Sequence, residues 1–193
     1  AIWTDAVLTL TLSPFAFLAF VGVSIAAVVS ARFGVLPFAF LALAIFIADV
    51  ATRDTRAGTT AIIYSSPRLR ENLVWWKLGS TCVLSLLFCA VPLAMSASGG
   101  FSRLATVLGG LLFVATFATA LGVITQNAKT FIVSFLSFWY VVVNDHGLSP
   151  ALDFAGFYRT ANARTLLLYG GVALVAIIAA QVAHRWRLER GVG

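Results

Sequence analysis

The chain has 193 residues, of which 61% are hydrophobic and only 10% are charged. Soluble domains carry about 25% charged residues, so a chain this apolar cannot keep its surface in water and is predicted to be an integral membrane protein in a lipid bilayer. Its formal net charge of +6 does not indicate a nucleic-acid partner, because the basic residues lie at the ends of apolar segments and form no basic face with interleaved aromatic residues.

The first two membrane spans are expected at about 7–31 and 35–51, each near the roughly 20 apolar residues that a spanning helix needs. No charged segment precedes the first span, so no signal peptide is predicted, and the start at Ala1 suggests processing, trimming or a longer protein. Near the end of the second span, Asp49 precedes Arg53 by four residues, which is the favourable order for an acid and a base on one helix. We expect an ion pair there, or a role in gating the inner mouth.

A polar and basic loop follows at 52–77, the longest stretch that is not simply apolar. A segment of this kind between two spans must lie in water or at the headgroups. Pro67 is predicted to open a short helix that ends near Trp75, because proline is tolerated in a first turn and Ser65-Ser66 can cap it. The helix has a polar and an apolar face, which is typical either of an anchor along the membrane surface or of a contact surface for another protein.

Four further spans are expected at about 78–95, 104–125, 130–143 and 166–183. Cys82 and Cys89 lie about 10 Å apart along the third, which is too far for a disulfide. The fourth contains Gly109-Gly110 and other small residues, which allow helices to approach closely in lipid.

The segment 144–165, between the fifth and sixth spans, is too long for a turn and too mixed in composition for a span. Phe154, Phe157 and Tyr158 are together too apolar to be left in water. We expect them to pack against the outer ends of the fourth to sixth spans.

The basic residues predict the orientation of the chain. Alternating the six spans places nine of them on the side of the loop 52–77 and four on the other side. The nine are Arg53, Arg56, Arg68, Arg70, Lys77, Lys129, Arg185, Arg187 and Arg190; the four are Arg32, Arg103, Arg159 and Arg164. An excess of Lys and Arg marks the cytoplasmic side, so the loop 52–77 and both termini are predicted to be cytoplasmic.

Motifs that would indicate an enzyme are missing from the sequence. There is no G-x-x-x-x-G-K-[ST] segment to hold ATP, and no H-E-x-x-H, C-x-x-C or G-x-S-x-G. His146 and His184 fall on opposite sides of the membrane in this topology, so they cannot share a metal. Asp145-His146 is the only acid–base pair near an apolar site, and a solvated helix end explains it more simply than catalysis does.

The order of residues in the loop 52–77 resembles the cytoplasmic loop of the type-2 ABC exporter permeases. Asp54 is followed by Gly58-Thr59, the apolar pair Ile62-Ile63, Ser65-Ser66-Pro67, Arg70 and Lys77. In that family an acid, Gly-Thr, an apolar pair, Ser-Thr-Pro, a basic residue and a final Lys occur at these offsets. Asp54 stands where Glu is usual, and Trp76 stands where Gly commonly precedes the Lys.

The resemblance implies an all-α, polytopic membrane protein with six transmembrane helices. It also implies a cytoplasmic coupling helix between the second and third spans, and short re-entrant helices between the fifth and sixth. The chain would be the permease subunit of an exporter in the bacterial inner membrane, with no cofactor of its own, paired with a second copy or a homologous permease. A separate ATP-binding cassette subunit would hydrolyse ATP with Mg and push on the coupling helix. The residues implied in coupling are Asp54, Arg56, Gly58, Thr59, Pro67, Arg68, Arg70, Glu71 and Lys77.

The spans carry few polar side chains beyond Thr and Ser, which suits an amphipathic or lipid-like substrate. Two other functions are alternatives. An ion-coupled secondary transporter needs acids or broken helices near the middle of the membrane, whereas Asp49 lies near the end of a span. A small membrane-embedded enzyme needs more convergent polar groups than Asp145 and His146 supply.

Overall fold

The computed structural model describes residues 14–29, 35–48, 50, 52–53 and 71–190. The described part of the chain folds into seven helices and contains no strand, which confirms the predicted all-α class. The helices are α2 (Pro14–Val29), α3 (Leu36–Ile47), α7 (Leu73–Phe88), α8 (Ala90–Ala97), α9 (Phe101–Thr125), α10 (Ala128–Asp145) and α11 (Ala163–Glu189). The start of the expected first span and most of the loop 52–77 lie outside the described residues.

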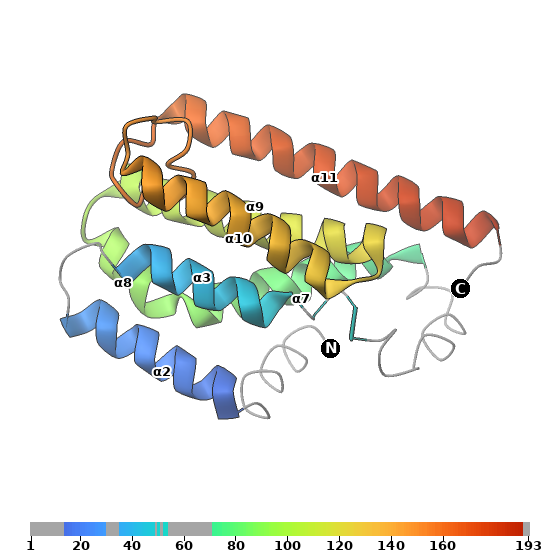
Figure 1. The fold of residues 1–193 in the computed structure, drawn as a ribbon, viewed down its shortest axis with the longest axis horizontal. Coiled ribbons are helices and arrows are strands. Elements are labelled where there is room, and N and C mark those ends of the chain that lie inside the picture. Colours follow the sequence, from blue (N-terminus) through green and yellow to red (C-terminus); the bar gives the residue numbers. More distant parts are fainter. Residues whose placement is uncertain (1–13, 30–34, 49, 51, 54–70, 191–193) are drawn as a thin grey trace.

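The helices run roughly along one axis in alternating directions and form a bundle (Figure 1). α9 lies at its centre and packs against α11, α7, α10, α8 and α3. α2 lies at the edge of the bundle, where it contacts α3 and α8. Successive segments therefore cross the bundle from end to end, as consecutive spans of a membrane protein do.

Two of the described helices, α9 and α11, are long and apolar enough to cross a membrane. α7 and α8 together meet the same test as a pair bent by 67°, which gives up to three candidate spans. α3 is a shorter apolar helix of 12 residues. A membrane protein is thus supported by the helices, whereas the six-span count stays a prediction.

The third span differs from its predicted bounds of 78–95 in two ways. α7 already begins at Leu73, so Leu73–Trp75 are its first turn and not the end of a separate short helix. The helix then breaks at Cys89, before α8. Pro92 explains the break, because it has no N–H to donate and its ring clashes with the carbonyl of the residue four positions earlier, Phe88.

An aromatic cluster fills the core near the segment 146–162, which joins α10 to α11. The Phe154 ring lies 5.6 Å from both the Phe40 ring on α3 and the Phe113 ring on α9, and 5.7 Å from the Tyr169 ring on α11. Such aromatic pairs each contribute about 0.5–1.5 kcal/mol beyond their buried area. Phe154 and Phe157 are only 1% and 3% exposed, which confirms that they are buried. The packing differs from the expected one in part, because Phe157 contacts Phe40 on α3, outside the expected fourth to sixth spans.

The re-entrant helices expected between the fifth and sixth spans are not present in this segment. Residues 146–162 form a chain of turns and bends without a helix. The reason is local: hydrogen bonds within the segment fold it back on itself, and four of its residues have positive φ, namely His146, Gly147, Gly156 and Arg159. A continuous helix cannot include residues in that conformation.

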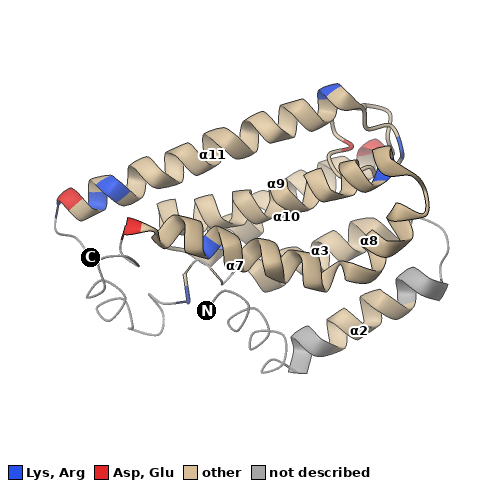
Figure 2. Cartoon of the chain, turned by 180° about the vertical axis from the view of Figure 1, so that it is seen from behind, with Lys and Arg blue, Asp and Glu red and all other residues tan. Residues whose placement is uncertain are grey.

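Among the residues that the structure describes, the charged ones gather at the two ends of the bundle and none lies in its middle (Figure 2). One end carries Arg53, Glu71, Lys77, Lys129, Arg185, Arg187, Glu189 and Arg190. The other end carries Arg103, Asp145, Asp153, Arg159 and Arg164. His146 and His184 lie toward opposite ends, as the alternating topology predicts. This distribution is the one expected for a bundle whose middle lies in hydrocarbon.

Candidate functional site at the base of the 52–77 loop

Lys77 joins the two helices that flank the loop 52–77. It lies in the second turn of α7 and is only 5% exposed. Its Nζ donates a hydrogen bond of 3.0 Å to the carbonyl of Val50, just beyond the end of α3. A cation is favoured near the C-terminal carbonyls of a helix, where the helix dipole is negative. The Trp76 ring, 5.6 Å from Nζ, adds a second favourable contact.

Hydroxyl groups continue from Lys77 along the contact between α7 and α9. Thr81 donates to the Lys77 carbonyl at 2.8 Å, and Ser85 donates to the Thr81 carbonyl at 2.7 Å. The Thr119 hydroxyl on α9 donates to the Ala115 carbonyl at 2.8 Å and lies 3.3 Å from the Thr81 hydroxyl. Donation back to the same helix is how Ser and Thr are accommodated in lipid, so this row is a close, uncharged helix contact.

Arg187 joins α11 to α9 at the same end of the bundle. Its Nη2 donates to the Val123 carbonyl, and its Nε donates to the Ala183 carbonyl at 3.3 Å. Gln126, which ends α9 with φ of 54°, also donates to the Val123 carbonyl at 2.9 Å. Two cations of this end, Lys77 and Arg187, therefore bind backbone carbonyls at helix ends and fix how α3, α7, α9 and α11 meet.

Three of the eleven residues predicted for coupling or gating lie in the described part of the chain: Arg53, Glu71 and Lys77. Lys77 is buried, Glu71 is exposed and Arg53 is partly exposed. The other eight, Asp49, Asp54, Arg56, Gly58, Thr59, Pro67, Arg68 and Arg70, lie outside the described residues, so the Asp49–Arg53 pair and the coupling helix stay predictions.

We expect Lys77→Met to lower the free energy of unfolding by about 1 kcal/mol, because the Val50 carbonyl loses a charged donor while the apolar stem is kept. Thermal unfolding in a mild detergent measures the change. Lys129→Met is the control, because Lys129 is exposed in the first turn of α10. Equal effects of the two substitutions would mean that the bond to Val50 contributes nothing measurable.

At the opposite end of the bundle, Asp153 organises the segment 146–162. It is 1% exposed and accepts hydrogen bonds from the backbone N–H groups of Tyr158, Thr160 and Ala161 and from the Thr160 hydroxyl, at 2.9–3.3 Å. Sequence reasoning missed this residue, because a single Asp in a mixed segment has no spacing that marks it. The only available signal was an acid among apolar residues that were themselves expected to be buried.

Side chains at the edges of this segment attach it to the helices. Tyr158 donates to the Val143 carbonyl at 3.0 Å, and Tyr169 donates to the Ala151 carbonyl at 2.9 Å. Burial raises the pKa of Tyr158 from 10.0, and the carboxylates of Asp153 and Asp145 raise it further. The neutral phenol is thus favoured in the folded state, so its contribution to stability is fully present below about pH 10 and is lost as the pH rises through the raised pKa.

Asp145 and His146 end α10, which agrees with the helix-end interpretation of this pair. Asp145 accepts a hydrogen bond of 2.8 Å from the Ser149 N–H, and His146 adopts the left-handed conformation with φ of 51°. His146 is exposed, and its Nδ1 lies 2.7 Å from the Asn144 carbonyl. Within the described residues, no three His, Cys, Asp or Glu side chains are grouped so that they could hold a metal ion.

The chain was compared with protein-family models, curated proteins and solved structures, and none of them matches it.

Proposed function

We propose that this chain is the membrane-spanning permease subunit of an ATP-driven exporter of the type-2 ABC class. It would lie in the bacterial inner membrane with both termini cytoplasmic, and a separate ATP-binding cassette subunit would supply the energy. The observation that carries the proposal is the order of residues from Asp54 to Lys77, whose last member closes the base of the loop through its bond to the Val50 carbonyl.

The packing around Lys77 supports a coupling role for the loop 52–77. α7 starts at Leu73 and continues without interruption past Lys77 to Phe88. It packs against α9, α3 and α11, so it contacts most of the bundle. A partner that displaced the loop would therefore act directly on a helix that lies in the core.

The apolar character of the bundle supports an amphipathic or lipid-like substrate and a second permease copy. α11 packs mainly on α9, and its other side exposes large apolar residues, among them Val175, Ile178 and Val182. With Trp186 they form an exposed apolar stripe along one face of α11. Lipid, substrate chains or a second copy of the chain are the apolar partners that such a surface accepts.

Replacing Arg70 and Glu71 together with Ala should detach the ATP-binding cassette subunit or uncouple ATP hydrolysis from transport, since both lie in the predicted coupling helix. Co-purification of Mg-dependent ATPase activity with the chain, and substrate-stimulated hydrolysis in vesicles, are the measurements. Glu189→Ala with Arg190→Ala removes the same two charges at the same end of the bundle, from exposed positions outside the loop.

The comparison of these two double variants tests the proposal. Loss of ATPase co-purification or of coupling only in the Arg70 and Glu71 variant supports it. If no ATPase accompanies the wild-type chain, or if the two double variants behave alike, the chain is not a permease coupled through this loop.

A further inference from the structure

The apolar stripe of α11, from Val175 to Trp186, leads to a basic end of the same helix. α11 lies along the outside of the bundle, and the residues of the stripe are 53–66% exposed (Figure 1). Arg185 and Arg190 flank the last of them, Trp186. We propose that the stripe and these two arginines bind a phospholipid with an anionic headgroup. This lipid site is independent of the proposed function, because neither the loop 52–77 nor an ATPase takes part in it.

Trp186 and Arg190 mark the boundary between the apolar and the charged part of this face. The Cζ atom of Arg190 lies 3.7 Å from the centroid of the Trp186 ring, so the guanidinium is in contact with the indole. Such a contact between a cation and an aromatic face is attractive. Tryptophan is enriched at the depth where the hydrocarbon of a bilayer meets the headgroups. Arg190, one helical turn further on, is therefore at the depth of the lipid phosphates.

The length of the stripe fits the acyl chains of one leaflet. Val175 and Trp186 are 11 positions apart in the sequence, which corresponds to about 16.5 Å along a helix. The hydrocarbon core of a bilayer is about 30 Å thick, so each leaflet contributes about 15 Å. An acyl chain that starts beside Trp186 would thus reach the middle of the bilayer next to Val175.

The charge at this helix end favours an anionic headgroup over a zwitterionic one. Residues 184–190 contain three arginines and a single acid, Glu189, which leaves two net positive charges. Arg187 donates its hydrogen bonds to backbone carbonyls, whereas Arg185 and Arg190 are exposed at the surface. Basic residues next to a membrane-spanning segment attract anionic lipids, and guanidinium groups match phosphate oxygens with a planar fork of donors.

A second copy of the chain fits this face less well than a lipid does. Two copies related by a two-fold axis along the membrane normal would bring the same patch of each together at the same depth. Arg185 and Arg190 of one copy would then face the same two arginines of the other, and like charges at close range repel. A lipid phosphate brings the opposite charge to the same place.

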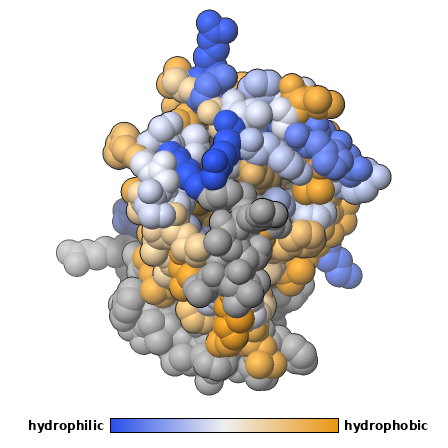
Figure 3. Space-filling view, turned by 90° about the vertical axis from the view of Figure 1, so that its left-hand side faces the viewer, coloured by the Kyte–Doolittle hydropathy of each residue, from blue (hydrophilic) through white to orange (hydrophobic). Residues whose placement is uncertain are grey.

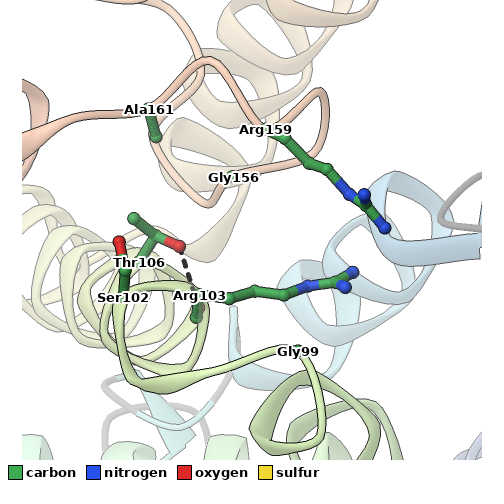
Figure 4. A pocket seen from close by; sticks show the side chains of 7 residues that line it. All are labelled: Gly99, Ser102, Arg103, Thr106, Gly156, Arg159 and Ala161. Atoms are coloured by element: carbon green, nitrogen blue, oxygen red, sulfur yellow. Dashed lines mark hydrogen bonds between the residues drawn. The ribbon is translucent and has the colours of Figure 1, made fainter.

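The arginines at the opposite end of the bundle are arranged differently. Arg103 and Arg159 line a pocket between the start of α9 and the segment 146–162 (Figure 4). Figure 3 views the molecule from this end, where hydrophilic residues gather across the upper part beside hydrophobic flanks. Arg164, in the first turn of α11, is exposed here and is not among the residues that line the pocket. It is therefore the arginine that best matches Arg185 and Arg190 in exposure.

Lipid binding to the purified full chain in neutral detergent tests the proposal. Native mass spectrometry compares the retention of phosphatidylglycerol, which is anionic, with that of phosphatidylcholine, which is zwitterionic. We expect wild type to retain phosphatidylglycerol preferentially. Arg185→Gln with Arg190→Gln should reduce this preference roughly 25-fold, about fivefold for each charge. Arg185→Lys with Arg190→Lys keeps both charges and should keep most of the preference.

Arg164→Gln is the matched control, because it removes an exposed arginine from the other end of the same helix. Leu168 lies one turn from Arg164, in place of the tryptophan that lies one turn from Arg190. This variant should keep the preference of wild type. Equal retention of the two lipids by wild type would overturn the site. The same holds if Arg164→Gln abolishes the preference or if the double glutamine variant keeps it.

Val182→Trp distinguishes a lipid from a second copy on the stripe. Fluid acyl chains adapt to a larger side chain, whereas a closely packed helix interface does not. Light scattering in detergent should therefore give the variant the same oligomeric state as wild type. Conversion of a dimer to a monomer by Val182→Trp would mean that a second copy covers the stripe, and the lipid site would be wrong.

Discussion

Asp153→Ala is expected to lower the free energy of unfolding by about 3–5 kcal/mol, the largest effect of any single substitution proposed for this chain. The carboxylate is 1% exposed and accepts bonds from three backbone N–H groups and one hydroxyl. Alanine leaves all of these donors without their acceptor in a place that water does not reach. Unfolding of the purified chain by heat or by SDS in mixed micelles measures the loss.

Asp145→Ala is the matched control, because Asp145 accepts a backbone hydrogen bond from Ser149 at the partly exposed end of α10. Asp145→Ala should lower the free energy of unfolding by about 1 kcal/mol. Asp153→Asn keeps one acceptor oxygen and should fall between the two alanine variants. If Asp153→Ala cost no more than Asp145→Ala, the segment 146–162 would owe its shape to aromatic packing instead.

Gly110→Ala is expected to lower the free energy of unfolding by up to about 3 kcal/mol, because the segment 146–162 packs directly against α9 at this position. A Cβ atom there would lie 2.5 Å from Cβ of Ala155 and 2.8 Å from its Cα. The second of these is a backbone atom, which cannot rotate away, so the whole segment must move off the helix. The same unfolding measurement detects the change.

Gly170→Ala makes the identical chemical change in the N-terminal part of α11, where nothing lies within 4 Å of the added atom. It should be neutral or stabilise the chain by up to about 1 kcal/mol, because alanine favours a helix more than glycine does. Equal responses of the two glycines would refute a close contact between Gly110 and Ala155.

The sequence predicted the helical class and the ends of several helices, because hydropathy and helix-breaking residues are local signals. The expected fourth span at 104–125 and the observed α9 end at the same residue, Thr125, where Gln126 and Asn127 interrupt the apolar run. Pro92 is also a local signal, and it breaks the third span after Phe88, where the expected helix continues to position 95. The 67° angle between the two parts is not encoded by the proline alone.

Contacts between residues that are distant in the sequence are harder to predict from it. The small residues Gly109 and Gly110 predict a close approach of helices, and Leu166 of α11 does lie next to Gly109. Gly110, however, is covered by Ala155, which belongs to the segment 146–162 and not to a helix. Lys77 was identified by its place in the loop motif, while its acceptor, the Val50 carbonyl 27 residues earlier, is a backbone atom that no residue pattern reveals. Asp153 and Arg159 depend on backbone conformations within one segment, which side-chain identity does not encode.

The break at Cys89 divides one apolar segment between two parts of the bundle. α7 is about 24 Å long, and its far end meets α8, which packs against α9 and α2, at an angle of 67°. Cys89 at this corner is fully buried, so the bend is packed on its inner side by neighbouring helices. α7 contacts α3 and α11, whereas α8 contacts α2, so the bend lets a single apolar segment cover α9 and still reach the helix at the edge of the bundle.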